Sequence, residues 1–123
     1  MNKIVLAIDD DATQLMMFKN VLHPGFNVFT VNSAANAIHF LNSNQADIIL
    51  LDISMPNISG FEFLHDIRKI PSYLKVPIII ISGKTGQEFI TEARNSGAFD
   101  VLSKPVEHDL LISVIEKALL PAQ

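Results

Sequence analysis

Polar side chains of a few reactive types stand at the ends of the apolar runs in this sequence. They are Asp9–Asp11 after "IVLAI", Asp52 at the end of "DIILLD", Ser82 at the end of "IIIIS" and Lys104 after "FDVLS". Carboxylates gathered in one cleft raise each other's pKa, and a hard cation such as Mg²⁺ relieves the repulsion because it prefers oxygen ligands. A remaining carboxylate is then a nucleophile towards phosphorus, and an ammonium and a hydroxyl group can hold the phosphoryl oxygens. The set predicts phosphorylation of an aspartate.

The elements that must position these side chains alternate along the chain. Five short runs rich in Ile, Val, Leu and Phe predict strands, and the segments between them have the apolar spacing of helices. The alternation predicts an α/β fold, a five-stranded parallel doubly wound sheet with five helices. Ligands of such sheets bind beyond the carboxyl ends of the strands, so we expect the polar groups to meet at one edge. The predicted strands are Lys3–Ile8, Phe26–Val31, Ile48–Leu51, Pro77–Ile81 and Phe99–Leu102.

Two helix boundaries carry clear signals. Ser33 is a candidate N-cap for a helix over 34–41, and Gly97 is a candidate left-handed stop after a helix near Phe89–Ala93. Asp11 suits the positive end of the first helix. The remaining helices are predicted around Thr13–Leu22, Phe61–Ile67 and Leu110–Ala118.

The last predicted helix carries more apolar residues than one stripe requires. Its core-facing stripe is predicted to comprise Leu110, Leu111, Val114, Ile115 and Ala118. Ile112 and Leu119 are expected roughly on the opposite side. A pair of exposed apolar residues there indicates a contact patch.

Length and composition narrow the class of protein. The 123 residues suit one domain over residues 1–123, with 119–123 a candidate start of a linker. Because 49% of the residues are apolar and 18% charged, a folded core is expected. A net charge of −4 disfavours direct binding of nucleic acid. The chain has no cysteine, and no apolar run approaches the roughly 20 residues of a membrane helix, so we expect a cytoplasmic protein without a membrane partner.

Four segments together carry a resemblance that covers essentially the whole chain. They are "IVLAIDDD", "DIILLDISMPNISGFEFL", "VPIIIISGK" and "GAFDVLSKP". In order and spacing they resemble the receiver domain of two-component response regulators, the CheY-like family. The resemblance implies a flavodoxin-like (βα)5 receiver fold and a phosphorelay switch rather than an enzyme acting on other substrates. Such a switch catalyses phosphotransfer to its own aspartate and the later hydrolysis.

The resemblance also implies roles for the acidic residues. Asp52 would accept the phosphoryl group from a sensor histidine kinase or a phosphotransfer protein. Mg²⁺ would be held by Asp10, by Asp9 through water, by Asp52 and by the backbone carbonyl of Ser54. The segment around Met55-Pro56 would shape the loop after the acceptor.

Three further residues are assigned to the switch by the same resemblance. Ser82 would move towards the phosphoryl group, and Lys104, before a cis Pro105, would contact its oxygens. The chain departs from the family at Val101, where an aromatic ring is usual. Because valine has no ring to turn inward, we expect signalling to rely on backbone shifts in the loop before the fourth helix.

The resemblance implies an output surface as well. The fourth helix, fifth strand and fifth helix would contact an output domain or a downstream protein, and the same face suits a homodimer.

Other readings are weaker. A pseudo-receiver, which binds partners without phosphorylation, is the main alternative, and Val101 keeps it open. A true phosphatase would need an acid–base residue beyond this set. The stretch "SGKTG" is not a P-loop, because Ile78 stands where that motif needs glycine. Ser82 is also a candidate cap for the helix that follows it. The four histidines have no metal-ligand spacing and are expected at the surface.

Overall fold

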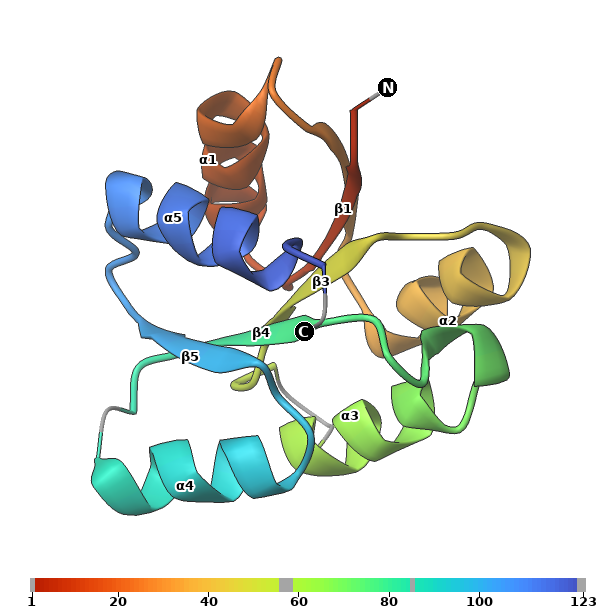
Figure 1. Ribbon diagram of the computed structural model, residues 1–123, viewed down its shortest axis with the longest axis vertical. Coiled ribbons are helices and arrows are strands. Elements are labelled where there is room, and N and C mark those ends of the chain that lie inside the picture. Colours follow the sequence, from red (N-terminus) through yellow and green to blue (C-terminus); the bar gives the residue numbers. More distant parts are fainter. Residues whose placement is uncertain (1, 56–58, 85, 122–123) are drawn as a thin grey trace.

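The computed structural model describes residues 2–55, 59–84 and 86–121 (Figure 1). Strands and helices alternate from β1 to α5, as predicted from the apolar spacing. The elements are β1 (Ile4–Ile8), α1 (Ala12–Leu22), β2 (Asn27–Val31), α2 (Ala34–Ser43), β3 (Ile48–Asp52), α3 (Gly60–Arg68), a 3-10 turn η1 (Pro71–Tyr73), β4 (Ile78–Ser82), α4 (Gln87–Asn95), β5 (Asp100–Ser103) and α5 (His108–Ala118).

The five strands form one parallel sheet in the order β2-β1-β3-β4-β5. This order confirms the predicted doubly wound sheet. β3 and β4 lie inside it and every residue of both is buried, as expected for strands covered on both faces. In the part of the chain that the structure describes, no helix is long and apolar enough to cross a membrane.

Alternate residues of the strands build two separate cores. One core contains Leu6, Ile49 and Ile80 and is covered by α2, α3 and α4. The other contains Val5, Leu50 and Ile81 and is covered by α1 and α5. Figure 1 shows α1 and α5 on one face of the sheet and the other three helices on the opposite face. The period of two in the strands produces this division.

The predicted helix boundaries at Ser33 and Gly97 are confirmed. Ser33 Oγ accepts from the Asn36 N–H at 3.1 Å, which caps α2. Gly97 follows the end of α4 with φ of +107°, a conformation that costs glycine little.

The prediction for α5 was partly wrong. Leu110 is 49% exposed, whereas Ile112 and Leu119 are half-buried and pack against the core. At about 100° per residue, Leu119 lies only about 40° around the helix from buried Ile115, so it borders the stripe rather than opposing it. The contact patch predicted at Ile112 and Leu119 is therefore not an exposed apolar pair.

Candidate functional site

The predicted polar groups meet at the carboxyl edge of the sheet. Asp52 ends β3 and is in register with Ile81, the residue before Ser82 at the end of β4. Ser82 is in register with Ser103, which ends β5 just before Lys104. Asp9 directly follows β1, the other neighbour of β3. Parallel strands on both sides of β3 thus bring these side chains around Asp52.

Three carboxylates at this edge form a cluster suited to a cation. One oxygen each of Asp9, Asp10 and Asp52 lies within 4.8 Å of the others. Asp9 and Asp52 are buried, at 0% and 2% exposed, while Asp10 is exposed. Like charges this close repel strongly in a partly dry site.

The pKa values of the two buried acids are shifted in opposite directions. Burial, together with the neighbouring Asp52 carboxyl, raises the pKa of Asp9 to about 7. Burial also acts to raise the pKa of Asp52, but hydrogen bonds from Ser54, the contact with Asp9 and the charge of Lys104 outweigh it and lower that pKa. Near neutral pH the pair therefore favours a charged Asp52 beside an Asp9 that is partly protonated.

Three donors converge on one oxygen of Asp52. Its Oδ1 accepts from the Ser54 N–H at 3.0 Å, from Ser54 Oγ at 2.8 Å and from Lys104 Nζ at 3.2 Å. Oδ2 has no such donor among the described residues, so its lone pairs are the more available of the two oxygens.

Ser54 was expected to act through its backbone carbonyl, and its hydroxyl was missed. A hydroxyl two residues after an aspartate can reach that carboxylate within one turn, which is the local signal that could have revealed the contact. Pro56, expected to shape the following loop, lies outside the described residues.

Ser82 ends β4, and Lys104 directly follows the adjacent strand β5. Ser82 is fully buried, and its Oγ accepts from the Lys84 N–H at 2.9 Å. Its proposed role as a helix cap was wrong, because α4 begins at Gln87 after an N-cap at Gly86. The Lys104 side chain is 33% exposed, and the Lys104–Pro105 peptide is cis.

Asp11 takes no part in the acid cluster. Its Oδ1 accepts from the Thr13 N–H at 2.9 Å and caps α1, and its own N–H donates to Asp9 Oδ1 at 2.9 Å. The third acid of the run therefore starts a helix and helps to orient Asp9, in agreement with its predicted place at the positive end of α1.

Val101 is half-buried against the core that α2, α3 and α4 cover. It lies on β5, three residues before Lys104. The four histidines are all exposed, as predicted.

The donors present fit Mg²⁺. Asp9 Oδ2 is buried without a hydrogen-bond partner among the described residues, a costly arrangement that a cation would relieve. The cluster offers only oxygen atoms, with one exposed carboxylate where bound water can enter, which is the environment Mg²⁺ prefers.

Comparison with known proteins gives a consistent result. The family model described as "Response regulator receiver domain" matches residues 5–116. The regulatory protein AtoC of Escherichia coli is 29% identical over 96% of this chain and 25% of its own length. The cell cycle response regulator CtrA of Brucella ovis is 37% identical over 90% of this chain and 47% of its own length. The chain thus spans about half or less of the length of these two relatives.

Solved structures of similar chains share the whole fold. The chemotaxis protein CheY4 of Vibrio cholerae has a TM-score of 0.91 and 28% identity, covering 97% of this chain and all of that one. A Francisella response regulator receiver domain has a TM-score of 0.86 and 29% identity, covering 96% of this chain and 97% of that one. The chain belongs to the response regulator receiver domain family of two-component signalling.

Proposed function

We propose that this domain is a Mg²⁺-dependent switch phosphorylated on Asp52 by a sensor histidine kinase or a phosphotransfer protein. The observation that carries the proposal is the position of Asp52. It is buried beside Asp9 and Asp10 and held through Oδ1 by Ser54 and Lys104. Among the described residues, neither Asp9 nor Asp10 accepts hydrogen bonds from both a hydroxyl group and a lysine ammonium group, as Asp52 does from Ser54 and Lys104.

In the transfer step the two oxygens of Asp52 have different roles: Oδ1 is held by its three donors, and Oδ2 is the nucleophile. Oδ2 attacks phosphorus of the donor phosphohistidine, the P–N bond breaks, and the imidazole leaves with the electron pair. Lys104 offsets the charge that develops on the phosphoryl oxygens. Asp9, Asp10, Asp52 and the Ser54 carbonyl would hold Mg²⁺, which supplies further charge neutralisation at the phosphoryl group when bound. Hydrolysis of the acyl phosphate by water returns Asp52.

The switch couples the phosphoryl group to the protein surface. Ser82 moves to donate its hydroxyl to a phosphoryl oxygen, and the backbone that joins it to α4 follows. Val101 offers no ring to report that motion, so backbone shifts before α4 carry it. Phosphorylation shifts an existing equilibrium between two forms, as in other protein switches.

The partners follow from this role. The kinase or phosphotransfer protein meets the acidic edge of the sheet in the cytoplasm. The α4–β5–α5 face contacts an output domain, a downstream protein or a second copy, and the domain itself binds neither nucleic acid nor membrane.

Phosphorylation by acetyl phosphate tests the proposal. With Mg²⁺, wild type is expected to gain the mass of one phosphoryl group and to bind beryllofluoride, whereas Asp52→Asn should do neither. Chelation of Mg²⁺ should abolish both effects. If folded wild type neither gains the mass nor binds beryllofluoride, the domain is a pseudo-receiver and the proposal fails.

A further inference from the structure

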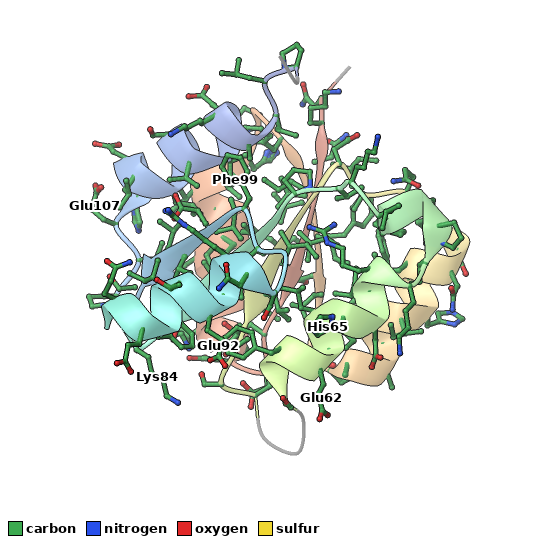
Figure 2. The ribbon with its side chains drawn as sticks, turned by 60° about the horizontal axis from the view of Figure 1, so that its bottom comes forward. Glu62, His65, Lys84, Glu92, Phe99 and Glu107 are labelled. Atoms are coloured by element: carbon green, nitrogen blue, oxygen red, sulfur yellow. The ribbon has the colours of Figure 1, made fainter. Side chains whose placement is uncertain are left out.

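Two phenylalanine rings join the segment after the phosphorylation site to the segment after Ser82. Phe61, in the first turn of α3, and Phe89, in the first turn of α4, have ring centroids 5.6 Å apart and planes inclined at 43°. Both rings are half-buried against the same core as Val101. Figure 2 shows α3 and α4 beside each other, with Glu62 marking the first turn of α3 and Lys84 preceding α4.

The Phe61 side of this contact is tied closely to Asp52. Ile53 follows Asp52 directly, and its side chain and carbonyl occupy the space where a Cβ on Gly60 would lie. Ile53 also donates its N–H to Ile81 O at 3.1 Å. Because Gly60 is packed against Ile53, the start of α3 is held firmly against the acceptor strand.

The Phe89 side is held much more loosely. A Cβ added at Gly83 or Gly86 would meet no described atom within 4 Å, so neither glycine is packed closely against the described residues around it. Among the described residues no side chain caps α4. Within Gln87–Asn95, all of which the structure describes, only Ala93 is fully buried.

Each of the other four helices buries at least two residues. The contact between Phe89 and Phe61 is therefore a principal restraint on the first turn of α4.

We infer that the Phe61–Phe89 contact positions α4 in the unphosphorylated form and that phosphorylation disrupts this contact. The inference rests on the proposed function. Ser82 already bonds the Lys84 N–H through its Oγ, so a shift of Ser82 towards a phosphoryl group displaces the chain that leads into α4. Phe89 then moves relative to Phe61, whose helix stays against Ile53. The ring contact takes the place of the missing aromatic at Val101 as the element that couples phosphorylation to α4.

Coupling between the ring contact and phosphorylation predicts the direction in which beryllofluoride affinity changes when a ring is removed. If the rings favour the unphosphorylated form, then removing a ring must favour the form that binds a phosphoryl group. Ring pairs of this kind contribute modestly beyond their buried area, and that contribution corresponds to about a 2- to 10-fold change in an equilibrium constant. Phe61→Leu and Phe89→Leu should each tighten beryllofluoride binding by about this factor. The double variant should gain little more than either single one.

The protein offers a matched control. Phe29 and Phe40 form a second ring pair, with centroids 5.4 Å apart and the same angle of 43°, between β2 and α2. β2 lies at the sheet edge, separated from β3 by β1. Phe29→Leu and Phe40→Leu should lower the melting temperature to a comparable extent and leave beryllofluoride affinity unchanged, because that pair spans no segment that follows Asp52 or Ser82.

The experiment is a beryllofluoride titration with saturating Mg²⁺, followed by NMR, on wild type and the variants, with thermal unfolding in parallel. Leucine retains the apolar bulk, so the variants should stay folded. Tighter binding by the Phe61 and Phe89 variants alone supports the inference. Unchanged or weaker binding by them, or equal tightening by the control pair, overturns it. Failure of wild type to bind would overturn the proposed function instead, so the two failures are distinguishable.

Discussion

The backbone N–H of Lys104 donates to the carbonyl of Ser82 at 2.9 Å, which extends the β4–β5 ladder by one residue beyond β5. The two residues expected to touch phosphoryl oxygens are thus joined through the main chain. A shift of Ser82 acts on the backbone of Lys104 as well as on the segment before α4. The position of the Lys104 ammonium group and the position of the Ser82 hydroxyl are therefore coupled.

Replacing Lys104 should impair chemistry more than folding. Lys104→Met removes a cation 3.2 Å from Asp52 Oδ1, and we expect phosphorylation by acetyl phosphate to slow by about 100-fold, the scale found for loss of one group that stabilises developing charge. Asp52 keeps its two donors from Ser54, so the domain should stay folded, but the loss of the cation beside a carboxylate that is only 3% exposed should lower the melting temperature modestly. Rates are measured by intact-mass spectrometry. Lys69→Met is the control, because Lys69 pairs at 3.7 Å with the exposed Asp66, and a wild-type rate for Lys104→Met would contradict the role of Lys104.

Asp9→Asn should stabilise the metal-free protein. Asp9 Oδ2 is buried without a partner among the described residues and faces a second carboxylate. Replacing the charge by an amide should raise the free energy of unfolding by about 1–3 kcal/mol at pH 8 without Mg²⁺.

The difference in the free energy of unfolding between Asp9→Asn and wild type should depend on pH in one direction. Because the pKa of Asp9 is raised from 3.8 to about 7, its contribution to stability is fully present below pH 3.8 and is lost as the pH rises through 7. The advantage of Asp9→Asn should therefore shrink between pH 8 and pH 5. Urea unfolding at both values measures it. A variant less stable than wild type at pH 8 would show that Asp9 is not strained in the metal-free form.

Much of this site could be predicted because its parts lie at strand ends. Asp9, Asp52 and Ser82 each directly follow or close an apolar run, and a parallel sheet brings such positions to one edge whatever the details of packing. The helix start at Asp11 was predictable because capping is local.

Features that depend on how helices rotate against the sheet could not be predicted. Exposed Leu110 and half-buried Ile112 lie on opposite flanks of the α5 stripe, and only the tilt of α5 on the core distinguishes them. The Phe61–Phe89 contact joins two helices across a sequence separation that no periodicity reports. Propensity and spacing describe one element at a time, whereas these contacts arise between elements.

Mg²⁺ binding should weaken as the pH falls below 7. Asp9 carries a proton below its pKa of about 7, and a cation must displace that proton to use the carboxylate. The dissociation constant for Mg²⁺ should rise by up to about tenfold per pH unit below 7 and level off above pH 8. NMR titrations with MgCl₂ at pH 6, 7 and 8 measure it. Affinity that is equal at pH 6 and 8 would exclude Asp9 as the titrating ligand.

Two glycines should respond very differently to replacement by alanine. In Gly60→Ala the new Cβ collides with the Ile53 side chain and lies 2.9 Å from its carbonyl oxygen, so we expect a loss of about 1–3 kcal/mol in the free energy of unfolding. Gly86→Ala meets no described atom within 4 Å and should change stability by a few tenths of a kcal/mol at most. Denaturant unfolding compares the two variants.

The collision at Gly60 should also reach the site, because Ile53 is bonded to Asp52. Gly60→Ala should therefore weaken beryllofluoride binding as well as folding, and the second change Ile53→Ala, which removes the colliding side-chain atoms, should restore part of both. Gly60→Ala with wild-type stability and wild-type beryllofluoride affinity would show that Ile53 yields easily. In that case α3 would not be held against the acceptor strand, and the asymmetry between Phe61 and Phe89 would lose its basis.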